Sequence, residues 1–217
     1  MKNLWKYFNP FYLVILIYIS LQPHISQAAK PTEQQLDTLS FIEMINSVDL
    51  GDQSGFIQQF QNKEARDRLL SKFTGNDGCT LENYRNKEVL LITIPARLLF
   101  APNETLLNDN AANYLAPFKR YLRQPDTYRV LLVMHTDNTG SEQYRDDITE
   151  ERVESIYEWF EEQGSDTSFL FPYAMGDEMP IYENDSQKNR DANRRLEIYL
   201  MPGLKMLEQA KKGRIEF

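Results

Sequence analysis

The segment HTDNTG at residues 135–140, followed by ITEER at residues 148–152, decides the fold of this chain. The first segment begins at the end of residues 129–135, where the apolar run at residues 130–134 predicts a buried strand. The second leads into residues 153–160, where apolar side chains recur at helical spacing. A buried strand, a polar loop and an amphipathic helix are the parts from which a sheet covered by helices is built.

Further strands and helices are predicted along the rest of the chain. Further strands are predicted at residues 89–94, 169–174 and 196–201, which are apolar or β-branched runs. Residues 107–122 have helical spacing, and Pro117 predicts a kink or break there. Pro95 ends or bends the first strand, or confines it to an edge, because proline cannot donate to a ladder. The order β-α-β-α-β-β predicts an α/β fold (an α+β sandwich), with a mixed sheet and right-handed crossovers between parallel neighbours.

The loop after the strand at residues 129–135 is a candidate binding site. It begins with Thr136 and Asp137, at the strand end where ligands bind in sheets with parallel strands. If Thr149 caps the next helix, Arg152 takes its third position and reaches back to this loop. Free N–H groups of the first turn would then add positive charge to the site.

A second block of the chain strengthens the pattern. It consists of Gly176, Pro180, Asn184 and the segment NRRLEI at residues 193–198. Together with residues 135–152, this block resembles the peptidoglycan-binding domain at the C-terminus of OmpA-like proteins. The resemblance covers about residues 89–202 and implies the same order of strands and helices.

The resemblance also implies which side chains bind a ligand. In that family, the Asp of the His-Thr-Asp turn and the Arg fifteen residues later bind the diamino acid of the cell-wall stem peptide. Asp137 and Arg152 keep this interval. Diaminopimelate carries an ammonium and a carboxylate on one carbon, so Asp137 would accept from the ammonium and Arg152 would bind the carboxylate through two parallel hydrogen bonds. The alternative is that Asp137 caps a turn and Arg152 pairs with a surface acid.

Three further residues complete the candidate site. By resemblance, Arg194 either lines the same pocket or forms a structural salt bridge. Thr136 and Asn138 either donate hydrogen bonds to the ligand or support the loop. Structural roles are predicted for Asn184, Asn193 and Arg195.

Four positions depart from the family pattern, and two of them matter most for this site. Ala101 follows Phe100 where the family commonly has Asp, and Arg145 replaces an Asn. These substitutions exchange polar or acidic pocket neighbours for a methyl group and a cation, which tilts the site towards anions. Either the stem-peptide specificity shifts or the pocket is degenerate.

The beginning of the chain has the pattern of a signal peptide. Residues 1–28 combine two lysines, an apolar core at residues 11–21 and the small-residue segment SQA. That core is shorter than the ~20 residues that span a bilayer, and an uncleaved anchor is the alternative. The expected location is the periplasm or cell envelope, with outer-membrane association as a further expectation. The predicted division is residues 1–28 (signal peptide), 29–87 (helical N-terminal segment and linker), 88–202 (binding domain) and 203–217 (solvated or frayed tail).

Charge and cysteine content exclude several classes of protein. The formal charge is −8, and it becomes −10 without residues 1–28, which contain two lysines and no acid. Such an acidic chain has no electrostatic basis for binding nucleic acid. Cys79 is the single cysteine, so no intrachain disulfide can form. It is either a small buried residue or a reactive thiol.

Competing functions find less support in the sequence. His135 is the one histidine after residue 28, no Gly-x-Ser-x-Gly motif is present, and no cofactor or metal is expected. A dyad of Cys79 and His135 lacks a local signature, although composition does not exclude a pair of glycosidase carboxylates. A motor stator needs an ionisable residue in a membrane helix, and residues 11–21 have none. The main alternative is an envelope adaptor with a degenerate wall pocket that binds a protein partner through residues 30–74. The sequence does not set the oligomeric state.

Overall fold

The computed structural model describes residues 36–75 and 77–216. The predicted signal peptide, and its alternative as an anchor, lie outside these residues. The chain divides into residues 1–38, of which 36–38 are described, and a compact unit formed by residues 39–217. Within the described ranges, no helix has both the length and the apolar character needed to cross a membrane.

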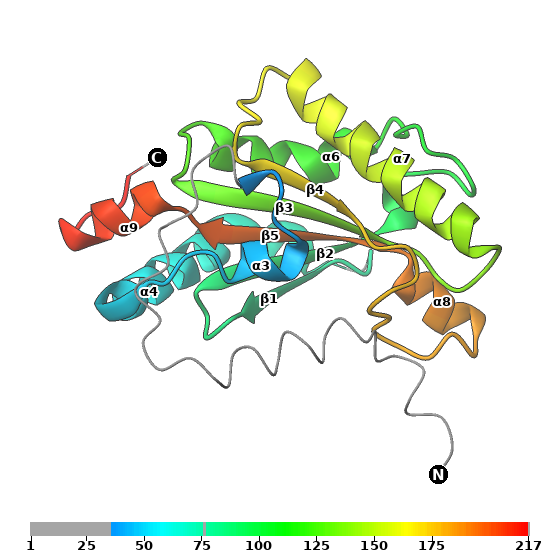
Figure 1. Ribbon diagram of the computed structural model, residues 1–217, viewed down its shortest axis with the longest axis horizontal. Helices are drawn as coiled ribbons and strands as arrows, with labels where there is room; N and C mark the ends of the chain where they lie inside the picture. The colour runs from blue at the N-terminus through cyan, green and yellow to red at the C-terminus, as the bar shows by residue number, and fades with distance from the viewer. Residues whose placement is uncertain (1–35, 76, 217) are drawn as a thin grey trace, which may run out of the picture. The chain divides into compact units, whose positions relative to one another are not determined.

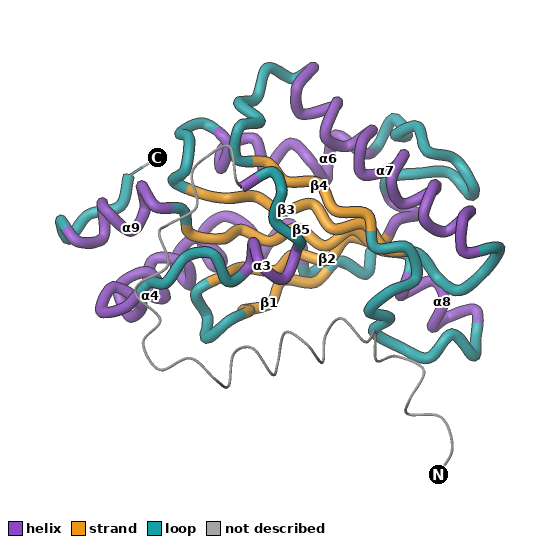
Figure 2. The backbone as a smooth tube through the Cα atoms, viewed as in Figure 1, coloured by secondary structure: helices purple, strands orange, loops and turns teal. Residues whose placement is uncertain are grey.

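A mixed five-stranded sheet forms the centre of the compact unit (Figures 1 and 2), with the strand order β1-β2-β5-β3-β4. The strands are β1 (Thr80–Tyr84), β2 (Val89–Pro95), β3 (Tyr128–His135), β4 (Leu170–Ala174) and β5 (Arg195–Pro202). β3 and β4 are parallel, and the other neighbouring pairs are antiparallel. The predicted fold class is therefore confirmed.

Helices pack around this sheet and join its strands. They are α3 (Phe41–Ile45), α4 (Ser54–Glu64), α5 (Leu70–Phe73), α6 (Ala111–Leu115), α7 (Glu142–Glu162), α8 (Gln187–Asn193) and α9 (Leu204–Lys211). α7 lies against β3 and β4, and α4 lies against β2. Pro117 breaks the helix as predicted, because α6 gives way to a 3-10 segment, η4 (Ala116–Leu122).

The apolar runs form a core because alternate residues of adjacent strands point to the same face. Ile92, Ile198 and Leu132 lie side by side across β2, β5 and β3 and are fully buried. On the opposite face, the ring of Phe41 in α3 packs against Tyr173 and Tyr199, with 5.8 and 5.2 Å between ring centres. The predicted N-terminal helices are thus present, and α3 packs directly on the sheet.

Two expectations about the flanks of the sheet were wrong. Residues 80–84 form strand β1 instead of part of a helical segment and linker. Its segment TLENY is largely exposed at the edge of the sheet, so it lacks the apolar alternation that reveals a strand. The tail is not a solvated helix either, because α9 buries Met206, Leu207 and Ala210 and contacts α4.

Candidate functional site

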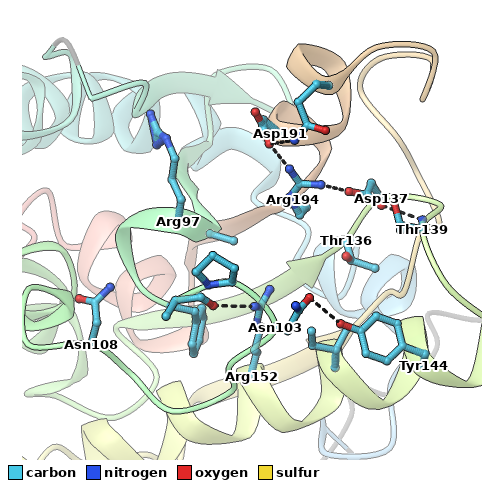
Figure 3. Close-up of a pocket in the computed structure, with 16 residues that line it drawn as sticks. Arg97, Asn103, Asn108, Thr136, Asp137, Thr139, Tyr144, Arg152, Asp191 and Arg194 are labelled. Carbon is cyan, nitrogen blue, oxygen red and sulfur yellow. Dashed lines mark hydrogen bonds and ion pairs between the residues drawn. The ribbon is translucent and has the colours of Figure 1, made fainter.

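A cavity of about 510 Å³ opens beside the carboxyl end of β3 (Figure 3). Its walls come from the loop after β2, the loop after β3, the N-terminal half of α7, and α8 with its C-cap residue. The lining includes Arg97, Phe100, Ala101, Asn103, Thr136, Asp137, Tyr144, Arg152, Asp191 and Arg194. The structure therefore brings together four of the five predicted site residues. Asn138 is not part of the lining.

Asp137 is a buried carboxylate at the cavity wall, and its side chain is 3% exposed. Its Oδ1 atom accepts a hydrogen bond from the backbone N–H of Thr139 at 2.7 Å, which closes a turn as the alternative interpretation predicted. Its Oδ2 atom pairs with Nη1 of Arg194. Burial alone would raise the pKa of Asp137, but the Thr139 hydrogen bonds and the charge of Arg194 hold that pKa below its usual value.

Arg194 is the C-cap residue of α8 and the bridge between two acids. Its guanidinium pairs with Asp137 through Nη1 and with Asp191 through Nη2 (Figure 3). Asp191 lies three residues earlier, in α8. The structure thus contains the predicted salt bridge of Arg194 and also places this side chain in the cavity wall.

Arg152 is a buried cation that contacts no carboxylate within the part of the chain that the structure describes. Its Nε donates to the carbonyl oxygen of Glu104 at 2.9 Å, and its Nη2 lies 3.5 Å from that of Ala101. Its guanidinium also lies over the ring of Phe100, 4.8 Å from the ring centre. Burial lowers the pKa of Arg152, and so does the charge of Arg194. The predicted alternative, pairing with a surface acid, is wrong.

Arg152 reaches the cavity from the middle of a helix. Thr149 is not the N-cap, because α7 begins at Glu142 and its N-cap is Ser141, whose Oγ accepts from the N–H of Tyr144 at 3.2 Å. The Thr149 hydroxyl instead accepts from the N–H of Gly176 at 3.1 Å and so ties α7 to the loop after β4. The expectation that free N–H groups of the first helical turn lie beside Arg152 is therefore wrong.

The two substitutions noted in the sequence have different consequences. Arg145 lies outside the cavity lining, because its Nε pairs with Asp177 at 2.7 Å and its Nη1 donates to the carbonyl oxygen of Gly140 at 2.8 Å. The expectation that Arg145 adds a cation to the pocket is wrong, since Asp177 neutralises it elsewhere. Ala101 does line the cavity and offers its carbonyl oxygen to Arg152.

The structural roles predicted for the second block are confirmed. Asn193 is fully buried, and its Oδ1 accepts from the N–H groups of Ile181 and Tyr182 at 3.0 and 3.1 Å. Its Nδ2 donates to Oδ1 of Asn184 at 2.9 Å. Arg195 is buried against Glu197, with 2.7 Å between Nε and Oε1. These contacts hold the ends of β5 and α8 that carry Arg194.

Several residues of the cavity wall were not predicted from the sequence, including Arg97, Asn103, Tyr144 and Asp191. The hydroxyl of Tyr144 donates to Oδ1 of Asn103 at 3.2 Å and so joins α7 to the loop after β2. Recognition of Ser141 as the N-cap would have placed Tyr144 in the first turn of α7. The approach of the loop after β2 had no signal in the sequence.

Comparison with known proteins identifies related sequences. Residues 99–194 match the family model described as the OmpA family. The outer-membrane lipoprotein YfiB of Pseudomonas aeruginosa is 33% identical over 103 residues, which cover 48% of this chain and 61% of that protein. The probable lipoprotein YiaD of Escherichia coli is 24% identical over 153 residues, or 70% of this chain and 67% of that protein. The match thus spans less than two thirds of the Pseudomonas relative.

Solved structures share the fold. A putative MotB-like protein from Desulfovibrio vulgaris superposes with a TM-score of 0.59 at 22% identity, covering 69% of this chain and 98% of that chain. The cell wall anchor of the T6SS from Pseudomonas aeruginosa gives a TM-score of 0.52 at 19% identity, covering 65% of this chain and 96% of that chain. At this level of identity, the likeness establishes the architecture.

Proposed function

From the match of residues 99–194 to the OmpA family model, we propose that the protein binds peptidoglycan non-covalently and attaches to the cell wall. One observation carries the proposal: the buried guanidinium of Arg152 faces the cavity without a carboxylate partner among the described residues. A buried cation is costly unless it is paired. A ligand carboxylate would supply the missing counter-ion.

Diaminopimelate of the stem peptide is the ligand that fits these charges best. Its carboxylate would bind the donors of Arg152 that the carbonyl groups of Ala101 and Glu104 leave free. Its ammonium would bind Asp137, which lines the same cavity. Thr136 lies beside Asp137 in that lining and would add a hydrogen bond. Asn138, which lies outside the lining, would support the loop.

We place the protein in the cell envelope as a non-catalytic anchor. Names of relatives support this location, since two are described as an outer-membrane lipoprotein and a probable lipoprotein. Among the charged residues that line the cavity, Asp137 and Arg152 form a pair of opposite charges suited to a zwitterion, and binding of such a ligand needs no catalytic group. Incubation with cell wall should therefore release no muropeptides.

A second candidate function is an envelope adaptor with a degenerate wall pocket. The observation that favours it is the ion pair between Asp137 and Arg194, which occupies the carboxylate that would bind the ligand ammonium. An adaptor would bind a protein partner through residues 30–74, where Ile42, Phe56 and Leu70 are exposed apolar side chains.

Co-sedimentation of the full chain with purified diaminopimelate-type sacculi separates the two functions. The parent protein should be retained, and Arg152→Gln should lose most of that retention because the substitution keeps hydrogen-bonding groups but removes the charge. Arg66→Gln is the matched control, since Arg66 is exposed and pairs with its neighbour Asp67. Failure of the parent to sediment would favour the adaptor, and equal retention of Arg152→Gln would exclude Arg152 as the main contact.

A further inference from the structure

Both carboxylate oxygens of Asp137 already have a partner within the chain in this structure. Oδ1 accepts from the backbone of Thr139, and Oδ2 is paired with Arg194. Because the side chain is 3% exposed, an incoming ammonium can reach it only from the cavity, where Arg194 already lies. A ligand ammonium and this guanidinium would therefore compete for the same carboxylate.

Arg194 has a second acceptor available when it leaves Asp137. Its Nη2 already pairs with Asp191, whose side chain is 50% exposed, and Arg194 itself is 30% exposed. The guanidinium can thus keep one ion pair while it gives up the other. Solvent reaches this outer pair, so the exchange does not leave a buried charge without a partner.

The side of the cavity that would bind the ligand carboxylate is arranged differently. Arg152 is 4% exposed, and its guanidinium is held between the ring of Phe100 and the carbonyl oxygen of Glu104. No acid among the described residues has to be displaced before a ligand carboxylate can bind there. Arg152 is therefore available to a ligand carboxylate, whereas Asp137 is occupied by Arg194 of the chain itself.

Resting on the proposed function, we infer that Arg194 holds the position of the ligand ammonium in the free protein and keeps only its pair with Asp191 when the ligand binds. Arg194 is then a specificity-determining residue that works against the ammonium. The site recognises the carboxylate first, and the ammonium adds affinity only to the extent that it outcompetes Arg194. Substitution of Arg194 should strengthen binding of an ammonium ligand, whereas substitution of a direct ligand contact would weaken it.

Two small probes isolate this effect. Meso-diaminopimelate and pimelate have the same seven-carbon dicarboxylate skeleton, and pimelate lacks both ammonium groups. Affinities of the full chain for each probe would be measured by titration calorimetry or by NMR chemical-shift titration. Arg194→Gln should raise the affinity for diaminopimelate by about tenfold. This increase is expected because the variant loses the charge-assisted hydrogen bond that competes with the ligand ammonium for Asp137. Its affinity for pimelate should stay unchanged or fall.

Asp191→Asn supplies the second arm. This variant removes the alternative acceptor of Arg194, so it should weaken diaminopimelate binding and leave pimelate binding unchanged. Weaker diaminopimelate binding by Arg194→Gln would overturn the inference and make Arg194 a ligand contact. Failure of the parent to bind sacculi or either probe would overturn the proposed function. In that case, binding of diaminopimelate by Arg194→Gln alone would still support the inference, and its absence would reject both.

Discussion

The guanidinium of Arg152 lies over the ring of Phe100, with 4.8 Å between Cζ and the ring centre. Phe100 follows the 3-10 turn η3 (Ala96–Leu98) after β2, whereas Arg152 projects from α7, so the contact joins two parts of the chain that lie 52 residues apart. The ring covers one face of the cation and restricts its plane. In this position Arg152 lines the cavity.

Phe100→Leu should therefore weaken ligand binding without removing a polar group. The cation–π contact contributes about 0.5–2 kcal/mol, so we expect affinity for sacculi or diaminopimelate to fall by roughly threefold to tenfold. Phe160→Leu is the matched control, because Phe160 is fully buried on α7 but does not line the cavity. Both variants should lower the melting temperature. Unchanged affinity in Phe100→Leu would show that the ring does not position Arg152.

Acid should destabilise the protein through Glu197. Burial alone would raise the pKa of this carboxyl, but His135, whose Nε2 lies 3.4 Å from Oε2, and the charge of Arg195 lower that pKa to about 2. A glutamate in the unfolded chain has a pKa of about 4.3. The folded state thus gains stability from ionised Glu197 above that pH, and loses it as pH falls towards about 2. The loss should reach about 3 kcal/mol at most.

Urea unfolding between pH 7 and pH 2.5 measures this dependence. Glu197→Gln should be less stable at pH 7 and should flatten the fall in stability below pH 5. Glu154→Gln, on the exposed side of α7, should keep the parent profile. A parent-like acid profile in Glu197→Gln would assign the acid sensitivity to other carboxyls.

The parts of the fold that could be predicted from sequence are those with a local signature. The strand expected at residues 129–135 is observed as Tyr128–His135, because every residue in it is buried and the apolar run is continuous. β1 could not be predicted, since its polar residues pair at an edge and gain stability from β2 instead of from burial. The spacing of apolar residues indicates which residues are buried. It indicates strand pairing only where the paired residues are also buried.

The candidate site was predictable as a set of residues but not as an arrangement. Asp137 and Arg152 do line one cavity. The start of α7 was misplaced because residues 142–147 are polar and carry no apolar periodicity, so Thr149 looked like the first capping residue. The pairing of Arg194 with Asp137 depends on how α8 ends beside the loop after β3. That approach is a tertiary contact without a sequence signal.

Cys79 should be unreactive in the folded protein. The buried-residue interpretation is confirmed, because the side chain is 4% exposed. Burial, with the nearby charge of Asp77, raises the pKa of the thiol to about 12, and the thiolate is the reactive form. Iodoacetamide at pH 8 should therefore label the native protein far more slowly than the urea-unfolded protein, as followed by intact mass. Equal labelling rates would place the thiol in an accessible or readily opened region.

The C-terminal helix should be an integral part of the fold, and Gly203 tests this. Gly203 precedes α9, and its N–H donates to the carbonyl oxygen of Thr127 at 3.0 Å. A Cβ atom at this position would lie 2.1 Å from the backbone oxygen of Asp126, which also accepts from the N–H of Lys205. Gly203→Ala must therefore push α9 away from this turn, and should cost about 3 kcal/mol of stability.

The matched control is Gly55→Ala in α4, where an added Cβ meets no heavy atom within 4 Å. Because alanine favours helix more than glycine does, this variant should gain about 0.5–1 kcal/mol. If α9 is docked as the structure shows, chemical denaturation should give changes in the free energy of unfolding that have opposite signs for the two variants. A tail that frays independently would instead leave the unfolding midpoint of Gly203→Ala at the parent value, because the displaced helix would carry no stability of its own.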